Sequence, residues 1–270
     1  MTQTPEKSYP NVVSAAHSAG MASTRAERRR TAPLRTWLAV DLGTLAYQKA
    51  WDLQIRLVNA KKAKAIAEDV ILFLEHPAVF TLGRRGGCEN LLVTAKFLAK
   101  ADIAVIQVER GGDITFHGPG QLVVYPIVDL PRSRLKVVDF VDTLEEIMIR
   151  TARNWGIPAQ RDARNRGIWV GDNKMGSIGI AVRRGISFHG LALNVSLDLS
   201  PFAWIQPCGL QGVGMTSMQR ELSRALSVAQ VREEVRRQFE AVLGVKLQDK
   251  SLFELQTNLH EIPDKIDNND

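Results

Sequence analysis

The stretch Arg110-Gly-Gly-Asp-Ile-Thr-Phe-His-Gly-Pro-Gly-Gln-Leu-Val-Val-Tyr-Pro126 decides how the middle of the chain folds. Its first eleven residues hold four glycines and a proline. Glycine occurs where the backbone takes a positive φ or must come close to another group. Because apolar, strand-like segments flank these residues at 103–108 and 122–128, we expect two strand ends joined by backbone that is shaped around a ligand. The alternative is a glycine-rich hairpin with incidental polar residues.

The stretch resembles the signature of the lipoyl(octanoyl) transferase family, R-G-G-x-x-T-[YF]-H-G-P-G-Q, and matches it without a gap. Further motifs of that family follow in the family's order, at 74–83, at Lys174 with 177–179, at 189–194 and at 207–209. Several spaced motifs in one order are a far more specific signal than one short motif. The resemblance covers residues 37–244 and implies the fold shared by the catalytic domains of biotin and lipoate protein ligases.

The order of apolar patterns independently predicts the fold class. Helical periodicity indicates helices at 45–59 and 137–155, and a capping box at Ser227 and Gln230 opens a third helix that ends at Gly244. Short strand-like segments alternate with these helices, and Gly171-Asp-Asn173 is a hairpin turn signal. The sequence therefore predicts an α/β (α+β) domain with a mixed, mostly antiparallel sheet flanked by helices.

The ends of the chain differ in composition from its middle. Residues 1–36 carry six basic and two acidic side chains and no sustained apolar periodicity, so we expect a disordered basic tail. A transit peptide, or a start placed too far upstream of Met21, would also fit. We expect the catalytic domain to span 37–250 and an acidic, polar C-terminal tail to occupy 251–270.

Composition limits which compartment, cofactors and binding partners we expect for the protein. The chain has 270 residues, of which 45% are hydrophobic, so it can bury a full core. Its two cysteines do not make a disulfide framework or a four-ligand zinc pattern, so we expect a cytoplasmic protein without a metal or other cofactor. No apolar run approaches the ~20 residues of a membrane span. Much of the excess positive charge lies in the basic tail, so nucleic-acid binding is not favoured.

Cys208 is the candidate nucleophile. Glycines surround it in Pro207-Cys-Gly209 and the following residues, where backbone amides can face a developing oxyanion. From its context alone, a small buried hydrophobic side chain is an equally good interpretation. The family resemblance implies that Cys208 carries the acyl group as a thioester. It also implies that Lys174 is the catalytic lysine, which lowers the pKa of Cys208 and takes part in proton transfer.

The resemblance implies an acyl-binding site as well. A saturated chain needs an apolar slot, and glycine and alanine let it lie close to the sheet. Two histidines in these motifs can serve as hydrogen-bonded wall residues, which we favour, or assist proton transfer. We expect His76, at a strand end within the 74–83 motif, to satisfy local hydrogen bonds. The implied substrate-binding residues are Arg110, Gly111, Gly112, Asp113, Ile114, Thr115, Phe116, His117, Ser177, Ile178, Gly179, Gly190, Leu191 and Ala192, and the second wall histidine is His189.

The resemblance implies a two-step acyl transfer with protein partners. The donor is octanoyl-acyl carrier protein, and the acceptors are lysines on the lipoyl domains of 2-oxoacid dehydrogenase complexes and on the glycine cleavage H protein. Because a thioester is already activated, the reaction needs neither ATP nor a metal. Two other functions remain open, namely an ATP-dependent lipoate or biotin ligase and a non-catalytic acyl-carrier binding protein. Residues 83–87, Gly-Arg-Arg-Gly-Gly, faintly resemble the phosphate loop of such a ligase.

Overall fold

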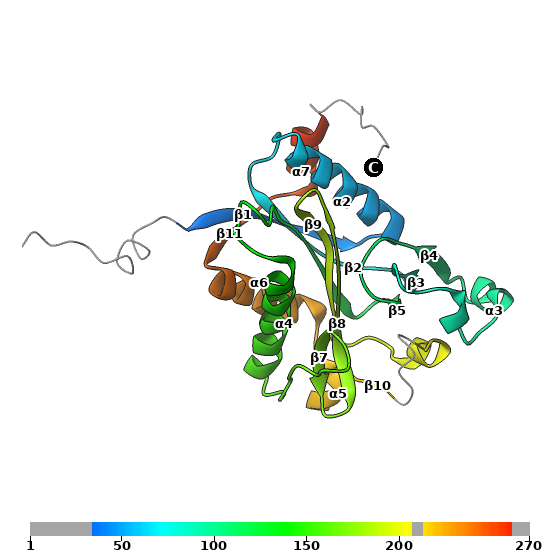
Figure 1. Ribbon diagram of the computed structural model, residues 1–270. Helices are drawn as coiled ribbons and strands as arrows, with labels where there is room; N and C mark the ends of the chain where they lie inside the picture. Colours follow the sequence, from blue (N-terminus) through cyan, green and yellow to red (C-terminus); the bar gives the residue numbers. More distant parts are fainter. Residues whose placement is uncertain (1–33, 207–212, 261–270) are drawn as a thin grey trace, which may run out of the picture. The chain divides into compact units, whose positions relative to one another are not determined.

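The computed structural model describes residues 34–206 and 213–260 (Figure 1). Eight strands form the main sheet in the order β10-β8-β9-β6-β2-β1-β11, with β7 paired to β8. Four of its seven strand pairings are antiparallel, which confirms the predicted mixed sheet. Its strands are β1 (Arg35–Thr44), β2 (Asp69–Glu75), β6 (Gln121–Ile127), β7 (Gly167–Val170), β8 (Asn173–Arg183), β9 (Ile186–Asn194), β10 (Gly214–Met215) and β11 (Val245–Asp249).

A second sheet and the helices complete the fold. The small sheet has the order β4-β3-β5. Two 3-10 turns, η1 (Cys88–Asn90) and η2 (Ser200–Trp204), lie in the connections. The other elements are β3 (Val79–Leu82), β4 (Ala104–Gln107), β5 (Ile114–His117), α2 (Tyr47–Lys62), α3 (Ala95–Lys100), α4 (Val137–Asn154), α5 (Met218–Leu222), α6 (Val228–Leu243) and α7 (Leu252–His260).

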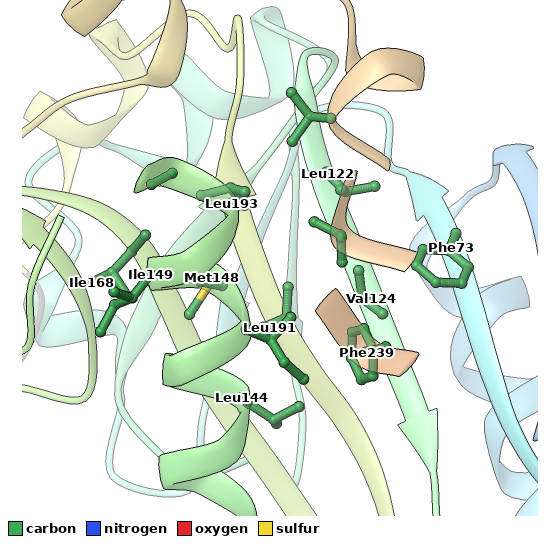
Figure 2. Close-up of a cluster of buried hydrophobic side chains, with 14 of the residues drawn as sticks. Phe73, Leu122, Val124, Leu144, Met148, Ile149, Ile168, Leu191, Leu193 and Phe239 are labelled. Carbon is green, nitrogen blue, oxygen red and sulfur yellow. The ribbon is translucent and has the colours of Figure 1, made fainter. Parts of the chain in front are cut away.

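Helices cover both faces of the main sheet because its strands are apolar on both sides. In β1, Trp37 and Ala39 belong to the buried cluster under α4 and α6, whereas Leu38 and Val40 belong to the cluster under α2 and α7. Successive side chains of a strand point to opposite faces, so one strand supplies both clusters. Figure 2 shows the first cluster, in which side chains of α4 and α6 point toward β2, β6 and β9.

The helix signals of the sequence are confirmed at α6. Ser227 and Gln230 form the expected capping box, and Gly244 ends the helix in the left-handed conformation at φ 62°. Glycine takes that conformation without the steric cost that other residues meet. The Gly171-Asp-Asn173 turn likewise connects β7 to β8.

The glycine-rich stretch departs from the expectation of two strand ends joined by a loop. Ile114–His117 is itself a strand, β5, which pairs with β3 in the small sheet. The chain then turns at 118–120 into β6 of the main sheet. The stretch therefore passes from one sheet to the other, and its irregular part is confined to 110–113 and 118–120.

The predicted C-terminal tail is wrong for residues 252–260. They form α7, in which Leu255 and Leu259 are buried against the cluster under α2. Ser251 and Glu254 make reciprocal hydrogen bonds at its start, the pattern of a capping box. The capping pattern and two buried leucines, four residues apart on one helix face, favour a packed helix although the segment is mostly polar. At the other end, β1 begins at Arg35, before the expected boundary at 37. Residues 1–33 and 261–270 lie outside the described residues.

The packing of α7 leads to a stability prediction. We expect Leu255→Ala to lower the free energy of unfolding by about 2 to 3 kcal/mol, because it removes a fully buried side chain. Phe253→Ala, in the same helix turn but 79% exposed, should change it by less than about 0.5 kcal/mol. Urea unfolding of both variants measures the difference. Equal, small effects would show that α7 does not pack on the domain in solution.

Candidate active site

A pocket of about 800 Å³, including the part open to solvent, lies where β8 and β9 meet the glycine-rich stretch. The structure brings thirteen of the fourteen expected substrate-binding residues to its wall, together with Lys174 and His189. These thirteen are residues 110–115, His117, 177–179 and 190–192. The motifs that are far apart in the sequence therefore form one cavity.

Phe116 is the exception among the expected substrate-binding residues. Its ring packs in the core of the small sheet, with its centroid 5.1 Å from that of Phe80 and 5.8 Å from that of Phe202. Alternation along β5 explains this placement, because Thr115 and His117 point one way and Phe116 points the other. Phe116 thus supports the pocket from behind its wall.

Lys174 lies at one end of the pocket, near the start of β8. Its Nζ is 5.5 Å from the ring centroid of Trp169, and both residues line the pocket with Asn165. β10 pairs alongside, with Met215 opposite Lys174, and Thr216 N donates to Lys174 O over 3.0 Å. The expected nucleophile, Cys208, lies outside the described residues, but Val213, five residues further on, lines the same pocket.

Glycines let three backbone segments meet at the pocket floor. Gly111 N donates to Ile180 O over 2.9 Å, which fastens the glycine-rich stretch to β8. A Cβ at Gly179 would lie 2.7 Å from Gly111 O, and one at Gly190 would lie 2.1 Å from Val124 O. Neither position has room for a side chain, so the sequence must have glycine at both. Backbone rather than side chains therefore forms the floor at these positions.

The basic turn at 83–87 is held against the glycine-rich stretch by its backbone. The amides of Gly83, Arg84 and Arg85 donate to the carbonyls of Asp113, Arg110 and Gly112 over 3.0–3.1 Å. A Cβ at Gly83 would lie 2.5 Å from Gly112 O, which explains a glycine here. These amides are therefore already used inside the protein.

A directed chain of hydrogen bonds runs through the buried wall of the site. The Arg110 guanidinium donates to Thr81 Oγ1 over 2.8 Å, and Thr81 Oγ1 lies 3.5 Å from His117 Nε2. His117 Nδ1 lies 2.7 Å from Gln121 Oε1. The chain continues from Gln121 Nε2 to Asn194 Oδ1 over 2.9 Å and from Asn194 Nδ2 to Thr216 O over 3.0 Å. Since an amide oxygen only accepts, His117 carries its proton on Nδ1.

The three buried histidines are neutral near pH 7. Burial lowers the pKa of His76 to about 4 and that of His189 to about 3, and it also lowers the pKa of His117 well below its ordinary range. Buried imidazole favours the uncharged form because the charge would lose its hydration. His76 donates from Nδ1 to Leu45 O over 2.6 Å and accepts from the Tyr125 hydroxyl at Nε2 over 2.8 Å. As expected, His76 makes local hydrogen bonds.

The pocket also has wall residues that the sequence motifs did not single out. Tyr47 and Tyr125 line it beside His117 and His189, and burial raises the pKa of Tyr47 to about 12. Tyr47 lies at the start of α2, within the helix that the periodicity predicts at 45–59, and nothing in that pattern indicates a pocket residue. Tyr125 belongs to the stretch 110–126, whereas Asn165 lies in none of the motifs.

Among the described residues, no group of three or more His, Cys, Asp or Glu side chains is placed to hold a metal ion. In the same ranges, no helix is both long and apolar enough to cross a bilayer.

Solved structures of two lipoate protein ligases share the fold of this chain. A bipartite lipoate protein ligase from Thermoplasma acidophilum superposes with a TM-score of 0.65 and 16% identity, over 85% of this chain and 92% of that one. A lipoate-protein ligase A bound with ATP gives 0.65 at 15% identity, over 84% and 94%. These likenesses confirm the expected fold of lipoate protein ligase catalytic domains.

The sequence comparisons identify the family. Residues 46–240 match the lipoyl protein ligase A/B catalytic domain, and the chain belongs to that family. An octanoyltransferase from Desulfotalea psychrophila is 46% identical over 196 residues, which cover 72% of this chain and 88% of that protein. An octanoyltransferase from Syntrophobacter fumaroxidans is 41% identical over 228 residues, covering 84% of this chain and all of that protein.

The neutral histidines predict acid-sensitive stability. An unfolded chain takes up protons on histidine below about pH 6.5, whereas folded His76 does so only near pH 4. The free energy of unfolding should therefore fall as the pH falls from about 6.5 toward 4. His76→Gln should reduce this slope between pH 6.5 and 5 by about 1 kcal/mol per pH unit, as measured by urea unfolding. An unchanged slope would mean that His76 is protonated in the folded protein.

Proposed function

We propose that the protein transfers an octanoyl group from octanoyl-acyl carrier protein to a lysine of lipoyl domains, through a thioester on Cys208. The observation that carries this proposal is the pocket itself, which has a lysine at one end and an apolar glycine floor beside it. The octanoyltransferase relatives support octanoyl as the transferred group, since they are 41–46% identical to this chain over most of its length. We infer donor, acceptors and the covalent step from the family motifs.

The first step exchanges one thioester for another. The Cys208 thiolate attacks the carbonyl carbon of the donor thioester, and the tetrahedral intermediate collapses with cleavage of the donor's carbon–sulfur bond. The carrier leaves as a thiolate that takes up a proton. This step needs no oxidant, reductant or nucleotide. The bulky carrier can then leave before the acceptor docks, which matters where two proteins use one pocket mouth.

The second step forms an amide. The neutral amine of the acceptor lysine attacks the Cys208 thioester, the new carbon–nitrogen bond forms, and the Cys208 thiolate leaves. The amine loses one proton, which Lys174 can accept if it has given up its own in the first step. The pairing of Met215 with Lys174 supports this role, because Met215 follows Cys208 by only seven residues.

The structure argues against the ATP-dependent alternative on one particular point. A phosphate loop binds its ligand with free backbone amides. The amides of residues 83–85 instead donate to carbonyls of residues 110–113. A non-catalytic binding protein would not need both Lys174 and Cys208, and the chain has both.

The remaining parts of the proposal concern the acceptor proteins and the cellular compartment. Lipoyl domains of 2-oxoacid dehydrogenase complexes and the glycine cleavage H protein are the acceptors that we propose, without a cofactor or nucleic acid. We place the reaction in the cytoplasm, because the chain has only two cysteines and its relatives are bacterial octanoyltransferases.

The acyl-enzyme is the direct test of the function. Incubation with octanoyl-acyl carrier protein, without an acceptor, should add one octanoyl mass that hydroxylamine removes and that maps to Cys208. Cys208→Ala should show neither adduct nor transfer. Cys88→Ala is the matched control, because Cys88 is exposed in η1, and it should keep both. A fully active Cys208→Ala protein, or transfer that requires ATP, would contradict the proposal.

Lys174 gives a second, separate test. In a Cys88→Ala background, the rate of Cys208 alkylation by iodoacetamide should rise with pH, because the thiolate is the nucleophile. Lys174→Ala removes a nearby cation, so the profile should move to higher pH and transfer should fall by at least about 100-fold. Lys62→Ala, an exposed lysine at the end of α2, serves as the control. An unmoved profile would place Lys174 away from the thiol.

A further inference from the structure

The pairing of β7 with β8 shifts by one residue next to Lys174. Before the shift, Ile168 pairs with Gly176. After it, Trp169 pairs with Lys174, which leaves Met175 as the extra residue of a β-bulge. A bulge changes where the neighbouring side chains point, and bulges are common next to active sites. Here the bulge brings the lysine, instead of Met175, directly opposite the tryptophan.

The side chains of this pair meet at the pocket. Directly opposite residues of two antiparallel strands have their Cβ atoms about 5 Å apart on one face of the sheet. Lys174 Nζ lies 5.5 Å from the centroid of the Trp169 ring, which is within the range of a cation–π interaction. Both residues line the pocket, and Trp169 is 0% exposed. Such an interaction is stronger at a buried ring than at the surface, because water competes less for the cation.

Hydrogen bonds hold the Trp169 ring in one orientation. Its backbone N–H and C=O both bond with the backbone of Gln160 over 2.9 Å, and its Nε1 donates to Asn165 O over 3.3 Å. At the start of β7, the N–H of Gly167 donates to the buried carboxylate of Glu145 in α4 over 2.9 Å. Strand β7 is thereby fastened to α4 on the side away from β8.

Gly167 leaves space for the lysine side chain. A Cβ at this position would lie 2.9 Å from Lys174 Cε and closer still to Gly176 O. The glycine also has φ 129°, a value that other residues rarely adopt. The aliphatic part of the lysine therefore lies against the backbone of β7, and its amine reaches the ring two residues further along.

We propose that Trp169 is a positioning residue, which holds the ammonium group of Lys174 against its indole face at this end of the pocket. This inference rests on the proposed octanoyl transfer, in which Lys174 takes part in proton transfer. The ring quadrupole attracts an ammonium group and not a neutral amine. The ring therefore fixes the place of the lysine and also favours its protonated form.

Charged side chains also lie around β7 and the pocket, on α4, in the loop before β7, in the β7–β8 turn and on the pocket wall. They are Arg110, Asp113, Glu145, Arg161, Asp162, Arg164, Arg166 and Asp172. Arg164 lies over the same ring, with its Cζ 4.5 Å from the centroid, and pairs with Asp162 over 2.8 Å. An uncharged replacement of Trp169 changes none of these charges, so an altered protonation of Lys174 reports on the ring.

The test follows the protonation of Lys174 directly. Acetic anhydride reacts with neutral amines, so the extent of acetylation at Lys174 against pH, read by peptide mass spectrometry, has a midpoint that reports the loss of the proton. We expect Trp169→Leu to lower this midpoint by about 0.5 to 1 pH unit, and Trp169→Phe, with a weaker ring, by about 0.3. Acetylation of Lys246, exposed in β11, is the reference in each sample.

Trp155→Phe is the matched control. Trp155 lies at the end of α4, and Arg224 Cζ is 5.5 Å from its ring centroid, so it also forms a cation–π pair, but it is not among the described residues that line the pocket. This variant should leave the Lys174 midpoint and octanoyl transfer unchanged. In contrast, kcat for transfer should fall about threefold in Trp169→Phe and about tenfold in Trp169→Leu, with KM for the donor within about twofold.

The outcomes separate this inference from the function on which it rests. A midpoint that stays in place in Trp169→Phe would overturn the positioning role, whether or not Trp169→Leu folds. A higher KM with an unmoved midpoint would overturn it as well, because the ring would then contact the acyl group instead. An equal change in Trp155→Phe would reduce the effect to a general loosening of the fold and would also overturn it. Absence of octanoyl transfer by the unmodified protein would contradict the function, whereas acetylation of Lys174 does not depend on transfer.

Discussion

The hydrogen-bond chain from Arg110 to Thr216 is the interaction on which the site depends. It passes through Thr81 of the small sheet, His117 and Gln121 of the glycine-rich stretch, and Asn194 of the main sheet. Every member donates in the same direction, so no position can reverse without breaking its neighbour. The chain ends at Thr216, whose amide donates to Lys174 O. His117 and Lys174 are thereby held by one network.

Close backbone approach is the second constraint, and it explains the glycines at 83 and 179. Residues 110–113 lie against the turn at 83–87 on one side and against Gly179 on the other. Each contact leaves no space for a Cβ, so a substitution would push the stretch away from β8. A pocket that is shaped by backbone rather than by side chains is rigid, which suits a slot for a flexible acyl chain.

The sequence predicted the position of the site better than the course of the chain. Thirteen of the fourteen residues that the motifs indicated line one pocket. Phe116 was misplaced, since motif membership does not reveal the alternation within β5. Helix α7 was missed because its two buried leucines are sparse in a polar segment. The role of Tyr47 could not be predicted either, because a tyrosine on an apolar helix face equally fits a core.

The electrostatics of the wall bear on which residue moves protons. A general acid or base works best when its pKa lies near the working pH. Burial holds the pKa of His117 and His189 far below neutrality, and the nearby Arg110 lowers both further. Both nitrogens of His117 already take part in the directed hydrogen-bond chain. Neutral imidazoles that are fixed in this way suit a hydrogen-bonded wall rather than a general acid.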